Sequence, residues 1–183
     1  MNARSSAITG AALFLFALGA VWAQGESPAA AQTALDQAIA LGRAGRWTEA
    51  ETVLLEGQRR FPSDSRFPVE LAGVAYRQGR FHAAKGYLHD ALRLDAEDRY
   101  ANDFLGTLYL LDGNVAATLK YWNRIEKPLI QHVLFVPPPP LDPLLRDRTF
   151  DISAGQVFTY RRLLQTEANV AALQTFSECR FAL

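Results

Sequence analysis

Three glycines spaced 34 residues apart constrain the fold of this chain more than any other feature. Gly45, Gly79 and Gly113 each stand at the same point of a similar segment, and these segments read GRWTEA, GRFHAA and GNVAAT. A fixed period of this length is typical of repeat proteins, in which each repeat is one supersecondary unit that stacks on the next. We therefore expect three similar stacked units.

Each unit reads as two helices that meet at the glycine. Glycine can adopt a positive φ and end the first helix. Two residues later an apolar residue (Trp47, Phe81 or Val115) begins the second helix. The small residues Ala50 and Ala84 allow the two helices to approach closely. Apolar residues recur at helical spacing, and the predicted helices cover 32–44, 47–61, 66–78, 81–94, 100–112 and 115–127.

This arrangement resembles the tetratricopeptide repeat, whose pattern is W-x2-L-G-x2-Y, then G-x-Y-x2-A, an aromatic residue, A-L and P. Besides the three glycine segments, the resemblance uses Leu105-Gly106, Tyr109, Pro62 and Ala91-Leu92, and it covers roughly residues 31–132. It implies a mainly α protein, a right-handed α-solenoid of three helix hairpins over 31–64, 65–98 and 99–130. Three residues depart from the pattern and are expected to loosen local packing: Gly57, Val115 and Thr118.

In this family the first helix of each unit lines a concave groove that contacts ligands. Carried onto this sequence, the groove positions are Gln32, Leu35, Ile39, Arg43, Arg66, Val69, Gly73, Tyr76, Arg77, Tyr100, Asp103, Thr107 and Leu111. The resemblance implies that the partner-binding residues are Arg43, Arg66, Tyr76, Arg77, Tyr100 and Asp103.

Arginine and tyrosine are frequent at interface hot spots, so this groove suits an extended or helical peptide with an acidic element. The alternative is that the arginines only solvate an inner surface. One variant of the family clamps a terminal carboxylate with lysine and asparagine in its first helix. Leu35 and Ile39 stand at those places here, so we expect no such clamp.

His82 and His89 lie two helical turns apart and share one face of the predicted helix 81–94. That spacing raises the possibility of a metal site. Zinc sites combine closely spaced ligands with a third ligand of defined geometry, and neither is present nearby. We therefore predict two solvated histidines and no metal.

Composition excludes several functions. Lysine and arginine total 19, as do aspartate and glutamate, so no strong field indicates a nucleic-acid partner. The sequence contains no phosphate-binding loop, dinucleotide glycine motif, zinc-protease motif or nucleophile elbow. Cys179 is the only cysteine and cannot form an internal disulfide. We predict no enzyme activity in this chain, no catalytic residue, no cofactor and no small-molecule substrate.

Residues 1–23 have the form of a secretory signal peptide. Arg4 precedes an uncharged apolar run over 7–22, and Val21 and Ala23 fit the −3 and −1 places of a cleavage site. The alternative is a membrane anchor, but the run is shorter than the about 20 residues that span a bilayer. We expect cleavage after Ala23, a linker over 24–30 and a periplasmic protein of a diderm bacterium.

After Pro128 the 34-residue period stops, and residues 131–183 predict a small α+β segment. We expect a strand over 132–136, extended polyproline over 137–140 and a helix over 141–150 with Asp142 as its cap. A turn over 153–155 should lead into a second helix, from Thr159 to about 174, and a strand over 177–183 should follow. The apolar face of the second helix is expected to consist of Leu163, Leu164, Val170 and Leu173.

The order strand, helix, helix, strand resembles the start of a POTRA (polypeptide transport-associated) domain, found in periplasmic parts of outer-membrane assembly and secretion barrels. The features carried over are the strand 132–136, the LDP sequence with its short helix, Gly155 before the second helix, and Leu173 and Phe176 before the second strand. A complete POTRA domain needs a third strand. Residues 131–183 are therefore either a truncated domain of a longer protein or a cap on the array.

The expected function is an exported scaffold that binds peptide segments of other proteins, in outer-membrane protein assembly or secretion. A downstream region could associate it with the outer membrane. One alternative is a structural or adaptor subunit of an envelope polysaccharide-export or cell-wall machine. A second is an enzyme whose catalytic domain lies beyond Leu183.

Overall fold

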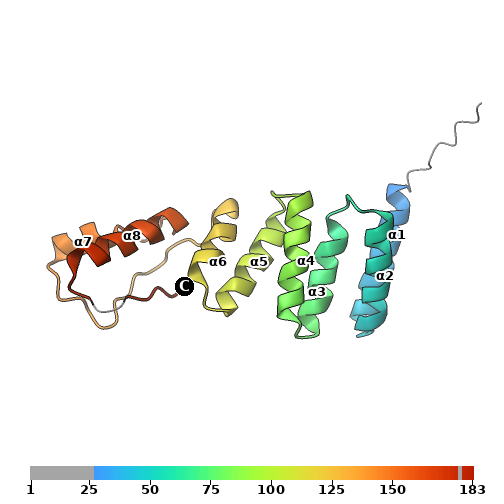
Figure 1. The fold of residues 1–183 in the computed structure, drawn as a ribbon, viewed down its shortest axis with the longest axis horizontal. Coiled ribbons are helices and arrows are strands. Elements are labelled where there is room, and N and C mark those ends of the chain that lie inside the picture. Colours follow the sequence, from blue (N-terminus) through green and yellow to red (C-terminus); the bar gives the residue numbers. More distant parts are fainter. Residues whose placement is uncertain (1–26, 177–178) are drawn as a thin grey trace, which may run out of the picture.

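The computed structural model of the protein describes residues 27–176 and 179–183, so the predicted signal peptide 1–23 lies outside the described residues. Six helices stack side by side as three antiparallel hairpins, and two further helices follow at the far end (Figure 1). The helices are α1 (Pro28–Arg43), α2 (Trp47–Arg60), α3 (Arg66–Arg77), α4 (Phe81–Leu94), α5 (Arg99–Leu111), α6 (Val115–Trp122) with the 3-10 turn Asn123–Ile125, α7 (Pro143–Phe150) and α8 (Tyr160–Leu173).

The three hairpin turns are alike, which confirms the prediction made from the glycines. Gly45, Gly79 and Gly113 have φ angles of 73°, 74° and 72°. In the first turn the amide of Arg46 donates to the carbonyl of Leu41 at 2.9 Å. The equivalent hydrogen bond, from an amide to the carbonyl five residues earlier, joins Arg80 to Ala75 at 2.8 Å and Asn114 to Tyr109 at 2.9 Å. This is the Schellman motif, in which the left-handed glycine allows the chain to reverse.

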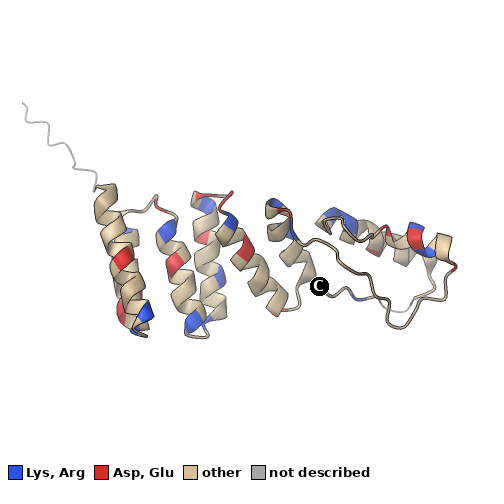
Figure 2. Cartoon of the chain, turned by 180° about the vertical axis from the view of Figure 1, so that it is seen from behind, with Lys and Arg blue, Asp and Glu red and all other residues tan. Residues whose placement is uncertain are grey.

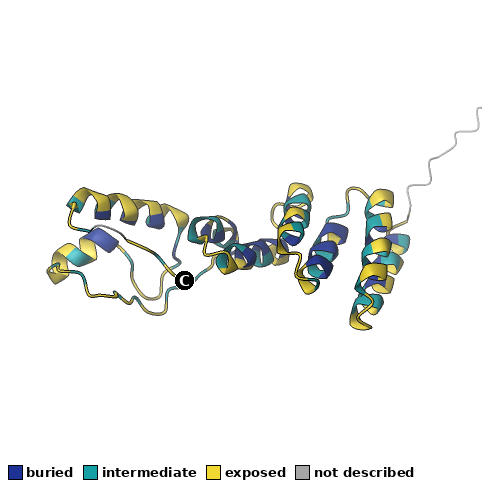
Figure 3. Ribbon diagram, turned by 60° about the horizontal axis from the view of Figure 1, so that its bottom comes forward, coloured by how far each residue is buried: buried dark blue, intermediate teal, exposed yellow. Residues whose placement is uncertain are grey.

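The core of the array runs through all three hairpins. Small residues at one register position, Ala50, Ala84 and Thr118, are all 0% exposed, so α2, α4 and α6 each lie close against their partner helix. Buried residues form the inner faces of the helices and exposed residues the outer faces (Figure 3). Thr118 fits because its hydroxyl donates to the carbonyl of Asn114 at 2.9 Å.

Helix α1 begins earlier than predicted, inside the segment 24–30 that was expected to be a linker. Ser27 caps the helix, because its side chain accepts a hydrogen bond from the amide of Ala30 at 3.3 Å. Pro28 occupies the first turn, where its missing N–H is not needed. No helix in the described part of the chain has the length and apolar character needed to cross a membrane.

The prediction that Gly57 loosens the packing is wrong. A Cβ on Gly57 would lie 2.1 Å from the ring of Phe67, which is fully buried and stacked on Phe61. Gly106 plays the same part against the indole of Trp122. In both places glycine makes room for a large ring, so the packing is tight.

The prediction of solvated histidines holds for His82, which is exposed, and is wrong for His89. His89 is half-buried, with Nε2 3.1 Å from the hydroxyl of Tyr109 and Nδ1 3.4 Å from that of Tyr121. Burial lowers the pKa of His89 below its ordinary value. Within 27–176 and 179–183, no group of three or more His, Cys, Asp or Glu side chains could hold a metal ion.

The two C-terminal helices begin where their caps predict. Asp142 accepts a hydrogen bond from the amide of Leu145 at 3.0 Å, and Thr159 accepts one from that of Arg162 at 3.2 Å. On α8, Leu163 and Val170 are buried as expected, whereas Leu164 is exposed. Thr166 is buried in place of Leu164, and its hydroxyl donates to the carbonyl of Phe150 at 2.9 Å. This bond joins α8 to the end of α7.

The two predicted strands are not formed in the described residues. Residues 132–136 belong to no strand, and neither do residues 179–183, while 177–178 lie outside the described part. Among residues 27–176 and 179–183, a single antiparallel bridge joins Leu129 to Val157. Because the pair is antiparallel, residues 132–136 would lie opposite the residues before Gln156, and there the chain turns at 154–155 and α7 ends at Phe150, so these residues have no strand to pair with. The predicted strand order is thus reduced to two helices flanked by extended chain.

Replacing Gly57 by alanine tests the tight packing. The added methyl group must displace the buried ring of Phe67, so we expect the free energy of unfolding to fall by about 1–3 kcal/mol. Gly86 on α4 is the matched control, since its Cβ would meet nothing within 4 Å. There alanine should raise stability by up to about 1 kcal/mol. Urea denaturation measures both, and equal effects would contradict the packing.

Candidate functional site

Arg43 of α1 and Arg77 of α3, two of the six predicted contact residues, line one pocket of about 450 Å³ between these helices. Both side chains are exposed, and neither takes part in an ion pair among the described residues. We call this the arginine pocket. Its lining residues are Ala38, Ile39, Gly42, Arg43, Gly45, Trp47, Leu54, Glu70, Val74 and Arg77.

The walls of the arginine pocket combine an apolar surface with one carboxylate. Ala38, Leu54 and Val74 belong to the buried core, and Trp47 packs against it. Glu70 is half-buried and makes no hydrogen bond or ion pair within the described chain. Burial raises the pKa of Glu70 above its ordinary value. The pocket therefore presents two guanidinium groups that reach into solvent and one carboxylate that is partly withdrawn from it.

A row of four aromatic side chains continues from the arginine pocket towards α5, and we call it the aromatic strip. Tyr100 lies 5.9 Å from Phe104 between ring centroids, Phe104 lies 5.4 Å from Tyr76, and Tyr76 lies 5.4 Å from Phe81. Tyr100 is 63% exposed, and Phe81 and Tyr76 are exposed too. The strip offers apolar area to a ligand at the surface.

The strip adjoins the pocket, because Tyr76 of the strip directly precedes Arg77 of the pocket on α3. Burial, followed by the charge of Glu70, raises the pKa of Tyr100, and Arg77 opposes this effect. Tyr100 therefore lies within electrostatic reach of both charged groups. Four predicted contact residues, Arg43, Tyr76, Arg77 and Tyr100, thus belong to one connected surface.

The other two predicted contact residues already hold partners. Arg66 is paired with Asp64 at 2.6 Å and donates to Gln32 at 2.8 Å. Asp103 is paired with Lys127 at 2.9 Å. These bonds join neighbouring parts of the array.

Leu35, which the resemblance placed on the groove, is instead a core residue with 3% exposure. It packs in the cluster that contains Phe67 and Leu71, because the start of α3 covers that face of α1.

Sequence reasoning did not identify Glu70, Trp47, Phe81 or Phe104 as parts of this surface. A signal was nevertheless present, because Phe104 stands 34 residues after Glu70, at the equivalent place of the next unit. The second unit thus has an acidic residue at the position where the third unit has an aromatic one, and this difference marks a local change in the repeat.

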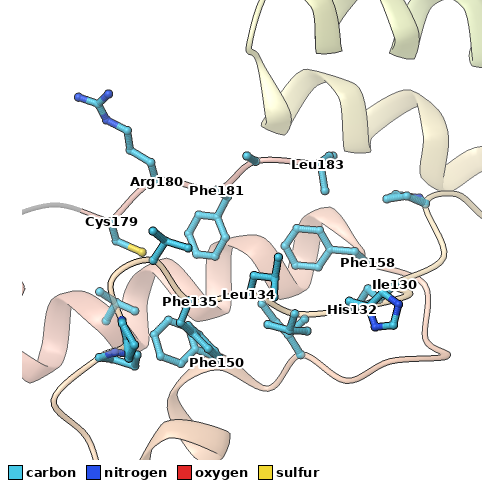
Figure 4. A pocket seen from close by; sticks show the side chains of 18 of the residues that line it. Ile130, His132, Leu134, Phe135, Phe150, Phe158, Cys179, Arg180, Phe181 and Leu183 are labelled. Carbon is cyan, nitrogen blue, oxygen red and sulfur yellow. The ribbon is translucent and has the colours of Figure 1, made fainter.

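A second cavity, of about 790 Å³, lies in the C-terminal part. Figure 4 shows the extended segments around Leu134 and Phe181 on its sides, with Phe135, Phe150 and Phe158 also lining it. Cys179 also lines it and is exposed, and burial raises the pKa of its thiol, which disfavours the reactive thiolate.

Charges of both signs are scattered over the described helices (Figure 2), and only α6 among the helices of the array carries a single sign, that of Lys120. This distribution agrees with the equal totals of acidic and basic residues. Local pairs such as Arg80 with Glu51, at 2.6 Å, join successive hairpins.

No family model matches the sequence, and no curated protein matches it. Solved structures do resemble it. The Yersinia enterocolitica type III secretion chaperone SycD, in complex with a peptide of the translocator YopD, is 14% identical with a TM-score of 0.51. The match covers 80% of this chain and 97% of that chain. A second SycD structure, an alternative dimer, is 13% identical with the same TM-score and covers 81% and 98%.

The second TPR of Spaghetti (RPAP3), bound to an HSP90 peptide, is 16% identical with a TM-score of 0.49 and covers 52% of this chain and 88% of that chain. The fold of this chain is a tetratricopeptide-type α-solenoid. The 34-residue period, the three equal turns and the SycD likeness agree on this point.

Replacing Glu70 by glutamine should raise stability at neutral pH. Because the folded pKa of Glu70 is raised, the folded state favours the neutral acid, and stability is lost as the pH rises through the ordinary pKa of glutamate. Glutamine is uncharged at every pH, so the Glu70→Gln variant does not lose stability in this way. Asp36 stands at the equivalent place of α1 and is exposed, so Asp36→Asn is the matched control. Urea denaturation at pH 7 and pH 4 measures both; a gain for Glu70→Gln that is equal at the two pH values would contradict the prediction.

Proposed function

We propose that this chain is a scaffold that binds peptide segments of partner proteins on the surface formed by the arginine pocket and the aromatic strip. The observation that carries the proposal is the meeting of Arg43 and Arg77, from successive units, at one pocket. Reversible docking needs no catalytic group, and we assign none.

The chemistry of this surface suits a peptide with an acidic element. Arginine binds carboxylates with two parallel hydrogen bonds, and two arginines at one pocket favour a negatively charged group. Next to them, Tyr76 and Tyr100 offer rigid apolar area at a low cost in conformational entropy. Charge and aromatic area side by side are the features of an interface hot spot.

The likeness to SycD supports the choice of a peptide as ligand, since SycD was solved in complex with a peptide of YopD. At 14% identity this likeness concerns the fold. The acidic character proposed for the ligand here rests on Arg43 and Arg77 of this chain.

Charge reversal tests the proposal. The full chain selects binders from a random twelve-residue peptide library displayed on phage, and we expect acidic sequences to be enriched. The double variant Arg43→Glu/Arg77→Glu should lose this enrichment while its circular dichroism stays unchanged. Arg59→Glu/Arg161→Glu is the matched control, because both residues are exposed and lie outside the arginine pocket. The same acidic enrichment from all three proteins would refute the proposed site.

We further propose that the scaffold acts in the periplasm, in outer-membrane protein assembly or secretion. The support is the signal-peptide form of residues 1–23 and the POTRA resemblance of residues 131–183. Of the elements of that resemblance, the helices α7 and α8 are formed, whereas the two strands are not formed in the described residues. A peptide-binding array would there hold extended segments of client proteins.

Processing of the amino terminus tests the proposed location. Protein recovered from the periplasmic or outer-membrane fraction of a diderm bacterium should begin at Gln24 on N-terminal sequencing. Replacing Ala23 by arginine should block cleavage, because the peptidase accepts only small residues there. Recovery of unprocessed wild-type protein from the cytoplasmic fraction would contradict the proposed export.

A further inference from the structure

The two junctions between successive units differ at register positions that otherwise correspond. At the junction of α3 and α5, Tyr76 and Phe104 meet edge to face at 5.4 Å and fill the space. Residues 34 positions earlier occupy the same places at the junction of α1 and α3, and they are Gly42 and Glu70. The first junction therefore lacks both aromatic rings, and the arginine pocket occupies that space.

An aromatic wall remains in the arginine pocket. A Cβ on Gly42 would lie 3.1 Å from the ring of Trp47, so this ring faces the place that a larger side chain would take. Trp47 corresponds in register to Phe81, which packs against Tyr76 at the other junction. The indole of Trp47 thus takes part of the space that a side chain at position 42 would fill, and the remaining pocket has this indole on one side and the carboxylate of Glu70 on another.

The charge of Glu70 decides which kind of ligand side chain fits best in the arginine pocket. An apolar side chain would bury this carboxylate further without a partner, which is costly. An acidic side chain would be repelled by it and would find Arg43 and Arg77 at the exposed edge instead. A basic side chain would pair with Glu70 and place its cation near the indole, the aromatic group that binds cations best. The repulsion that Arg43 and Arg77 exert on this cation is offset when an acidic residue of the same peptide binds them at the exposed edge.

We propose that the arginine pocket receives a lysine or arginine side chain of the bound peptide, held by Glu70 and Trp47. This inference rests on the proposed function, since it names a second element of the same ligand. The preferred peptide then carries a basic residue next to an acidic one. The acid binds Arg43 and Arg77 at the edge, and apolar residues follow along the aromatic strip.

The same phage library tests the inference through the sequences it yields. The wild-type chain should enrich peptides that contain a lysine or arginine beside an acidic residue. Glu70→Gln should keep the acidic preference and lose the basic one. Asp36→Asn removes an equivalent charge 34 residues earlier, where Asp36 accepts a hydrogen bond from Gln32, and it should keep both preferences.

A synthetic copy of a selected peptide then measures the contact directly. Replacing its basic residue by norleucine should weaken binding to the wild type about tenfold or more, as expected for loss of a charge-assisted bond. The same replacement should change binding to Glu70→Gln by less than about threefold, because the partner charge is already absent.

A variant whose arginine pocket is filled with aromatic side chains, called the filled variant, tests the inference in a second way. Gly42→Tyr, Trp47→Phe and Glu70→Phe together copy the aromatic group Tyr76, Phe81 and Phe104 of the other junction. This variant should stay folded and lose the basic preference.

The outcomes separate the two proposals. Acidic enrichment without any basic preference in the wild type overturns the inference and leaves the proposed function standing. A basic preference that survives in Glu70→Gln or in the filled variant also overturns it. No enrichment of any sequence by the wild type overturns both.

Discussion

Each helix hairpin of this chain buries its apolar face against a neighbouring element, the first two against the next hairpin and the third against α8, and the rest of the structure depends on that packing. Ala50, Ala84 and Thr118 are fully buried at the same register position, so the three hairpins have the same internal spacing. Equal spacing and equal turns place residues 34 positions apart at equivalent points of successive units. Arg43 and Arg77 come together at one pocket for this reason.

Local signals made much of the fold predictable. The glycine turns, the helices that begin at Trp47, Phe81 and Val115, and the caps of α7 and α8 all depend on residues within a few positions of each other. The sequence pattern alone was enough for these elements.

Features that depend on a partner far along the chain were not predictable in this way. His89 is half-buried because Tyr109 and Tyr121 come from the next unit. The residues over 132–136 have the composition of a strand but lack a partner to pair with. In the candidate site, Arg43, Arg77, Tyr76 and Tyr100 were found by family register, whereas Glu70 could be found only by comparing the units with one another. The site arises where the junction of α1 and α3 differs from the junction of α3 and α5.

The way the last hairpin is covered limits how such an array could have grown. Leu119 of α6 is fully buried in a cluster with Phe158 and Leu163, which come from the start of α8 and the segment before it. This is the face on which a fourth hairpin would stack. A gene duplication that added a unit directly after α6 would therefore have to compete with α8 for the same surface. Duplication of an internal unit avoids this competition, because it inserts a hairpin between faces that already match, and it lengthens the ligand-binding surface by one unit.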